Sequence, residues 1–189
     1  LQNIPVRTDT GRDIRRAFVA STYDDPWFVA GDYSQIELRV LAHVTKDEGL
    51  VSAFLADQDI HRATAATVYG VTPGDVTRQM RDTAKMVNFG IAYGMGEFGL
   101  ASRTGMTREE AEAFITTYYR NFPGIALWQQ QTLSSTREKG YAETLFGRRR
   151  YLPAIRSTNF QVRSAAEREA INMPIQGTSA DMTKLAMVR

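Results

Sequence analysis

One helical segment, from about Asp75 to Tyr93, constrains the fold more than any other part of the sequence. Within it, four side chains follow one another at intervals of four residues: Arg81, Lys85, Phe89 and Tyr93. Because an α-helix has about 3.6 residues per turn, this spacing keeps them on one face, with a drift of about 40° per step. Mostly apolar side chains fall on another side, at Val76, Met80, Thr83, Val87 and Ile91. The segment is therefore predicted to be a helix that packs on the protein by one side only.

The other face of this helix carries two cations and then two aromatic rings, over roughly 18 Å. Ammonium and guanidinium groups pair with phosphates, and aromatic rings stack on bases. The order therefore suits a ligand with phosphates at one end and a sugar and base at the other. The alternative is a solvated helix whose aromatic rings enter the core.

A second candidate site lies around Asp32. Two apolar runs, 17–20 and 27–30, flank a polar turn and predict a pair of strands, with Asp32 where the second strand ends. Ser34-Gln-Ile-Glu37 has the capping-box pattern, so a helix should begin about one residue later. A carboxylate at such a junction could hold a divalent cation for phosphoryl transfer. The alternatives are that Asp32 only complements the helix N-terminus and that Glu37 only caps it.

The composition is that of a globular protein, with 43% hydrophobic and 23% charged residues in 189. The absence of cysteine excludes disulfides and thiolate zinc sites, which leaves oxygen ligands and makes magnesium the natural metal. Lys and Arg (23) nearly balance Asp and Glu (21), so the net charge is weak evidence for an anionic partner. Local clusters of basic residues, such as the arginines at 148–150, are the better indication. No apolar stretch approaches the roughly 20 residues that cross a bilayer, and no signal segment opens the chain. We therefore expect no membrane partner and a cytoplasmic location.

Further helical patterns cover 49–55, 59–69, 107–121 and 125–139, and Thr107-x-x-Glu110 caps the one that begins at 107. Strand patterns return at 144–146 and 151–152, around a turn at Gly147. A last helical pattern runs over 162–173, breaks at Pro174 and Gly177, and restarts after Ser179. The sequence thus predicts an α+β fold that is mostly helical, with a large helical insertion between strand-bearing ends.

Two stretches resemble motifs A and B of the family A DNA polymerases, the bacterial DNA polymerase I kind. They are Asp-Tyr-Ser-Gln-Ile-Glu-Leu-Arg at 32–39 and Arg81-x-x-x-Lys85-x-x-Asn88-Phe89-Gly90-x-x-Tyr93-Gly94. Further matches follow in the family's order at 1–5, 59–61, 143–150 and 172–178, so the resemblance covers essentially the whole chain. It implies an incomplete right-hand fold: a palm segment at 1–48, fingers at 49–140, and a return from fingers to palm at 141–189.

The resemblance also implies roles at the nucleotide. Asp32 would ligate two Mg²⁺ ions, with the backbone carbonyl of Tyr33 as a further ligand. Arg81 and Lys85 would grip the incoming triphosphate, and Lys85 would also protonate the leaving group. His61 and Gln35 would also contact the triphosphate, and Phe89 would pack on the deoxyribose. Glu37 would exclude a 2′-hydroxyl, and Tyr93 would stack in the templating-base position. Without that match, a lone histidine such as His61 is more often a surface residue.

The implied partners are primer-template DNA and deoxynucleoside triphosphates, bound by a monomer. Contacts with DNA would come from Asn3, Arg7, Tyr93, Gly94, Arg149, Arg168, Asn172 and Gln176. The implied location is the cytoplasm of a bacterium, in association with the nucleoid, with a phage or organelle origin left open. For the three consecutive arginines at 148–150, the alternative is a solvated turn.

The family's third motif, a His-Asp-Glu turn with the second metal-binding aspartate, would follow Arg189. We therefore expect the chain to be excised from a longer protein and, alone, not to polymerise. A nucleic-acid-binding module that keeps the fold without catalysis is the main alternative. A magnesium-dependent nuclease or another nucleotidyltransferase would explain Asp32 but not the stripe of four side chains.

Overall fold

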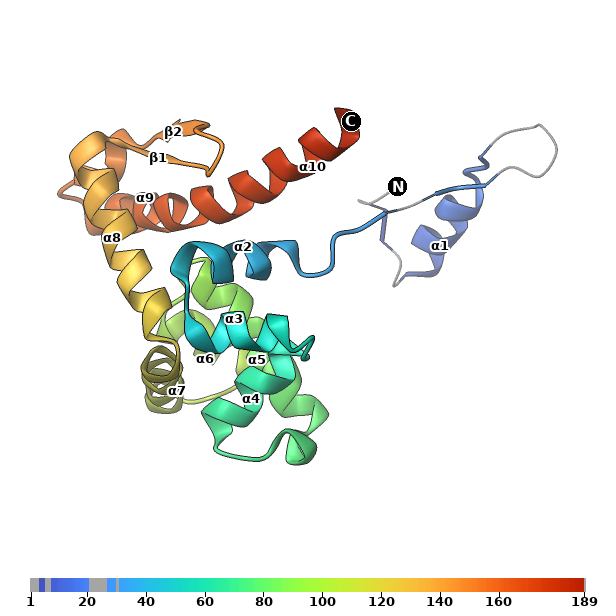
Figure 1. Ribbon diagram of the computed structural model, residues 1–189, viewed down its shortest axis with the longest axis horizontal. Helices are drawn as coiled ribbons and strands as arrows, with labels where there is room; N and C mark the ends of the chain where they lie inside the picture. Colours follow the sequence, from blue (N-terminus) through green and yellow to red (C-terminus); the bar gives the residue numbers. More distant parts are fainter. Residues whose placement is uncertain (1–3, 6–7, 21–26, 30, 189) are drawn as a thin grey trace. The chain divides into compact units, whose positions relative to one another are not determined.

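The computed structural model describes residues 4–5, 8–20, 27–29 and 31–188. The chain divides into two compact units, Leu1–Ser34 and Gln35–Arg189 (Figure 1).

The described part of the first unit contains the helix α1 (Asp9–Arg16). Thr8 caps it by accepting a hydrogen bond from the Gly11 backbone at 3.1 Å, and Arg16 pairs with Asp13 one turn earlier. The predicted strand pair is wrong for residues 17–20 and 27–29, which form no strand. Trp27 and Val29 are 77% and 95% exposed, and a two-stranded hairpin without a packed face is marginal in water. Ala30 lies outside the described residues.

The second unit begins with seven helices that surround one core. They are α2 (Ile36–Thr45), α3 (Glu48–Leu55), α4 (Ile60–Tyr69), α5 (Arg78–Ala92), α6 (Glu97–Thr104), α7 (Arg108–Asn121) and α8 (Pro123–Lys139). Fully buried side chains from α2 to α8, such as Leu41, Val87 and Tyr118, form the core. Within it α4 packs along α5, and α6 packs on α7 (Figure 1).

Capping residues set where several of these helices begin. Asp59 caps α4, and Thr107 forms a capping box with Glu110 at the start of α7, so both predicted starts are confirmed. The predicted helix at 75–93 begins later, at Arg78, because Thr77 caps it and Pro73–Asp75 forms a separate 3₁₀ turn, η1. Helix α6 was not predicted; it is a short amphipathic run that follows a glycine-rich turn.

One buried carboxylate, that of Asp47, joins two helix N-termini. Its Oδ1 accepts from the backbone of Gly49 at 3.1 Å and Leu50 at 3.3 Å, in α3. Its Oδ2 accepts from the backbone of Gly124 at 2.9 Å, in the first turn of α8. A Cβ at Gly124 would lie 3.0 Å from this carboxylate, so the contact depends on glycine.

The chain then forms the hairpin β1 (Tyr141–Glu143) and β2 (Arg149–Tyr151), which is antiparallel with Tyr141 opposite Tyr151. These strands lie a few residues from the predicted ones, with Gly147 in the turn at φ +81°. The turn η2 (Pro153–Arg156) leads to α9 (Phe160–Asn172), the π turn η3 (Met173–Gly177) and α10 (Thr178–Val188).

The predicted break at Pro174 and Gly177 is confirmed for the α-helix, since α9 ends at Asn172 and α10 begins at Thr178, but the backbone between them stays helical. Pro174 has no N–H to donate, and the backbone accommodates it by widening into a π turn. The described part of the chain is therefore mostly helical with one two-stranded sheet, which confirms the predicted fold class. None of its helices combines the length and apolar character needed to cross a membrane.

Candidate functional site

The helix α5 presents the predicted stripe on one side. Ala84, Val87 and Ile91 are completely buried against the rest of the unit. On the other side Lys85 is exposed, and Phe89 and Tyr93 are half-buried with part of each ring against the core. The separation of the two faces is confirmed, except that Met80 is only partly buried. The rings neither project freely nor enter the core entirely.

At the N-terminal end of this stripe, Arg81 is held by Asp59. The Arg81 Nε donates to Asp59 Oδ2 at 2.7 Å, with each side chain about one-third exposed (34% and 35%). The other oxygen of Asp59 accepts from the backbone of His61 at 3.1 Å and Arg62 at 3.2 Å. Burial acts to raise the pKa of Asp59, but these hydrogen bonds and the Arg81 charge outweigh it and lower that pKa. Asp59 therefore stays ionised and fixes Arg81 on the first turn of α4.

His61 is buried, at 3% exposure, so the surface alternative is wrong. Its Nδ1 lies 3.1 Å from the Asn88 side-chain amide, and its ring centroid lies 5.7 Å from that of Phe89. Burial lowers the pKa of His61, and the charges of Arg81 and Lys85 lower it further against the opposing effect of Asp59. The imidazole is therefore neutral, beside the basic side chains of Arg81 and Lys85.

At the other end of the stripe, the Tyr93 hydroxyl donates to the carboxylate of Glu37. Burial raises the pKa of Tyr93, the bond to Glu37 raises it further, and a hydrogen bond with the Gln176 side chain opposes this. The start of α2, the end of α5 and the π turn thus meet at one phenol. The predicted capping box is wrong, because Gln35 is the N-cap, in a left-handed conformation (φ +53°), and its side chain makes no capping hydrogen bond. Glu37 is instead engaged by Tyr93.

A cleft of about 930 Å³ opens beside α5. The predicted residues Lys85, Phe89, Tyr93, Gly94 and Arg168 line it, together with others that the sequence analysis did not assign: Phe98, Arg103 and Phe160. Of these, Phe98 and Arg103 lie on the unpredicted helix α6.

Gly94 adopts φ +72°, and a Cβ there would lie 3.2 Å from Cγ of Arg168. The left-handed backbone conformation therefore favours glycine, and a Cβ there would also press on the Arg168 side chain.

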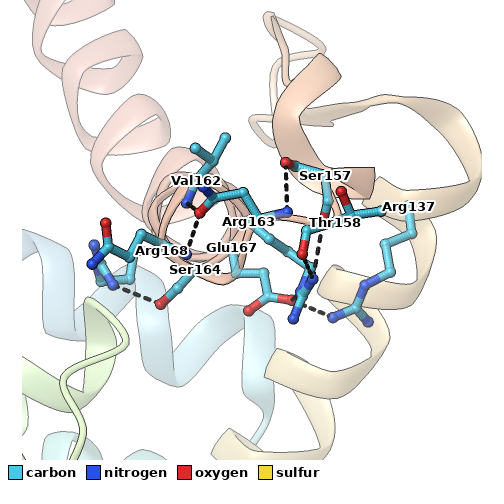
Figure 2. A network of polar contacts seen from close by, with 10 residues as sticks. Arg137, Ser157, Thr158, Val162, Arg163, Ser164, Glu167 and Arg168 are labelled. Atoms are coloured by element: carbon cyan, nitrogen blue, oxygen red, sulfur yellow. Dashed lines mark hydrogen bonds and ion pairs between the residues drawn. The ribbon is translucent and has the colours of Figure 1, made fainter.

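Polar contacts fix α9, which carries Arg168 to this cleft (Figure 2). Glu167 accepts from Arg137 of α8 at 2.6 Å, and Arg163 donates to the Ser157 carbonyl at 2.9 Å. Arg168 itself donates to Ser164 Oγ, one turn earlier, at 2.9 Å. The exposed Arg168 guanidinium is thus held on a helix that is tied to α8.

The remaining predicted DNA contacts are dispersed. Arg149 is exposed on β2. Its Nε lies 3.5 Å from Glu143 Oε2, and its Cζ lies 4.6 Å from the centre of the Tyr141 ring. Asn172 has a buried side-chain oxygen without a hydrogen-bond partner, and Gln176 is exposed in the π turn. Asn3 and Arg7 lie outside the described residues.

The predicted metal ligands Asp32 and Tyr33 are exposed and belong to the first unit. Among the described residues, no three His, Asp or Glu side chains are grouped so as to hold a metal ion. Magnesium is commonly held by one or two carboxylates together with substrate phosphates and water, so an exposed aspartate beside a backbone carbonyl fits its chemistry.

The family model of DNA polymerase family A matches residues 1–189. The chain is 54% identical to DNA polymerase I of Pseudomonas aeruginosa and 52% identical to that of Bacillus subtilis, over 188 and 189 residues. These matches cover 100% of the chain but only 20% and 21% of the relatives, so it spans about a fifth of their length. Its fold is similar to the polymerase domain of Pol1 from M. smegmatis, solved with DNA primer-template and dNTP. The TM-score is 0.89 at 42% identity, over 100% of this chain and 33% of that one.

Proposed function

The chain belongs to DNA polymerase family A, and we propose that it forms the part of a template-directed DNA polymerase that receives the incoming deoxynucleoside triphosphate. The observation that carries this proposal is the stripe on α5, where Arg81 and Lys85 precede Phe89 and Tyr93 along one face. A triphosphate, a sugar and a base would meet these side chains in the same order.

The cationic end of the stripe is suited to phosphates. Arg81 uses its Nε–H on Asp59, and a guanidinium has five N–H donors, so others remain for a triphosphate. Lys85, one turn later, is exposed and can place its ammonium on the same ligand. We assign to Lys85 the transfer of a proton to the leaving pyrophosphate, and to His61 and Gln35 further contacts with the nucleotide. At 3% exposure, the His61 ring contacts a phosphate only after neighbouring side chains move.

The aromatic end is suited to the sugar and the template. We propose that Phe89 packs on the deoxyribose and that Glu37 occupies the space of a 2′-hydroxyl. The bond from Tyr93 supports the role of Glu37, because it holds the carboxylate near α5. Tyr93 would occupy the templating-base position while that bond exists and leave it when the nucleotide pocket closes, as a two-state element.

For the metal site we propose Asp32 with the backbone carbonyl of Tyr33. When bound, magnesium would activate the primer 3′-hydroxyl and neutralise the leaving pyrophosphate. Asp32 supplies a carboxylate, which is the kind of hard oxygen ligand that magnesium prefers. Two ions are expected in the complete site.

Duplex contacts are proposed for Asn3, Arg7, Gly94, Arg149, Arg168, Asn172 and Gln176. The unpartnered oxygen of Asn172 supports its role, since a buried polar atom without a partner favours a ligand contact. We retain the palm, fingers and return segments at 1–48, 49–140 and 141–189. We also propose that the protein is a monomer that works in the cytoplasm at the nucleoid, where its DNA would be.

Primer extension by the protein that contains this chain tests the function. Template-directed synthesis should require Mg²⁺ and be abolished in Asp32→Ala, while primer-template affinity is retained. Extension that is independent of Asp32 would overturn the metal assignment. Binding without extension would favour the non-catalytic module, and metal-dependent degradation of the primer would favour a nuclease.

A further inference from the structure

Asn88 lies on the packed side of α5 and is completely buried. Its neighbours on this side include Ala84, Val87 and Ile91, which are also completely buried. A buried amide is unfavourable unless its donors and acceptor find partners. The partners of Asn88 therefore explain why this position carries an amide.

All of these partners lie on α4. The Asn88 Nδ2 is 3.1 Å from Nδ1 of His61 and 3.1 Å from Oγ1 of Thr64. The Thr64 hydroxyl also lies 3.2 Å from the Asn88 Oδ1. Thr64 is itself completely buried, so the three side chains form a closed polar cluster between the two helices.

This arrangement favours one orientation of the amide. As placed, both Nδ2 hydrogens have an acceptor, one on His61 and one on Thr64. If the Asn88 Oδ1 and Nδ2 were exchanged, the amide oxygen would face Nδ1 of His61. The N–H that now points at His61 would then have no acceptor. A buried N–H without an acceptor is unfavourable, because it has lost its hydrogen bonds to water and gained none in the protein. Nδ1 of His61 is therefore the acceptor, and its proton is on Nε2.

We propose that Asn88 is a positioning residue that holds His61 in its Nε2–H form, so that the neutral ring presents a hydrogen-bond donor to the triphosphate. This inference rests on the nucleotide-binding role proposed for His61. Arg81 and Lys85 disfavour a third cation beside them, which agrees with the lowered pKa of His61. A neutral imidazole has a single N–H, and Asn88 decides which nitrogen carries it.

Nitrogen-15 NMR of the ring nitrogens tests the first half of the proposal in the 189-residue chain. The chain has two histidines, so a His43→Gln variant assigns the His61 signals. We expect a protonated Nε2 and an unprotonated Nδ1 at neutral pH. In Asn88→Leu this preference should be lost, whereas in Thr64→Val, which removes the other partner of the amide, it should persist. A protonated Nδ1 in the unmodified chain would overturn the proposal, whether or not any variant folds.

Affinity for a deoxynucleoside triphosphate, measured by calorimetry on the same variants, tests the second half. Asn88→Leu should weaken binding about tenfold, the worth of one hydrogen bond to a charged group. His61→Leu should weaken it as much, and the double variant no further. Thr64→Val should bind normally and serves as the control for general loosening between α4 and α5.

The outcomes separate the two proposals. Unchanged affinity in His61→Leu would overturn the nucleotide contact of His61. It would also overturn the effect of Asn88 on nucleotide binding, even if the NMR result holds. Weakened affinity in His61→Leu but not in Asn88→Leu would overturn the positioning role of Asn88 alone. Equal losses in Asn88→Leu and Thr64→Val would also overturn it, because they would point to packing.

Discussion

The hydroxyl of Tyr93 donates a hydrogen bond to the carboxylate of Glu37, across 56 positions of the chain. This bond joins the end of α5 to the first turn of α2. It couples the ring proposed to occupy the templating-base position to the carboxylate proposed to exclude a 2′-hydroxyl. Movement of the ring would thus release the carboxylate.

Removing either side of this bond should change sugar selectivity. Glu37→Ala should increase ribonucleotide incorporation by the protein that contains this chain, because the space for a 2′-hydroxyl opens. Tyr93→Phe should produce a smaller increase, because the carboxylate stays in place and loses only one hydrogen bond. The measurement is the ratio of incorporation efficiencies for a ribonucleotide and its deoxynucleotide. Unchanged selectivity in Glu37→Ala would contradict the assignment.

Acid should destabilise the chain through His61. Its folded pKa lies below the ordinary value of 6.5, so the unfolded chain binds the proton more readily. The contribution of neutral His61 to the free energy of unfolding is therefore fully present above about pH 6.5. It decreases as the pH drops below that value. Urea unfolding should show a steeper loss for the unmodified chain than for His61→Gln. Parallel curves for the two proteins would contradict the lowered pKa, and His43→Gln serves as the control at an exposed site.

Replacing Asp47 should weaken two helix starts at once. Asp47→Ala removes the acceptor for Gly49 and Leu50 in α3 and for Gly124 in α8. Each lost cap costs about 0.5–2 kcal/mol, so we expect about 1–4 kcal/mol from urea unfolding. Thr107→Ala, which removes one cap, is the reference. A loss for Asp47→Ala no larger than the reference would show that the α8 contact contributes nothing.

A side chain at Gly94 should disturb both the fold and the cleft. Gly94→Ala places a Cβ at φ +72° and 3.2 Å from Arg168 Cγ, so we expect a loss of about 1–2 kcal/mol and weaker primer-template binding. Gly74→Ala is the matched control, because a Cβ there meets only Thr72 Oγ1, at an ordinary 3.7 Å, and Gly74 neither has a left-handed φ nor lines the cleft. Thermal unfolding and DNA affinity measure the two effects. Similar behaviour of both variants would contradict the requirement for glycine at Gly94.

Predictions that depended on neighbouring residues were mostly correct. The spacing of Arg81, Lys85, Phe89 and Tyr93 predicted a helix with two different faces, and Thr107 with Glu110 predicted the start of α7. Helical spacing and capping involve residues three or four apart, so they can be seen in the sequence. The capping box at Ser34 failed for a tertiary reason, because Tyr93 engages Glu37. The strands at 17–20 and 27–29 failed because a strand pair needs a packed face that its own residues do not provide.

By itself, the sequence determined the helical fold class, the family and the order of cations and rings on α5. Only the tertiary structure decided what holds those side chains. Asp59 binds Arg81 across 22 positions, Asn88 meets His61 across 27, and Gln129 of α8 donates to the Ile91 carbonyl across 38. Such pairs form only when packing of the apolar faces brings separate helices together, and no local pattern encodes the distance between them.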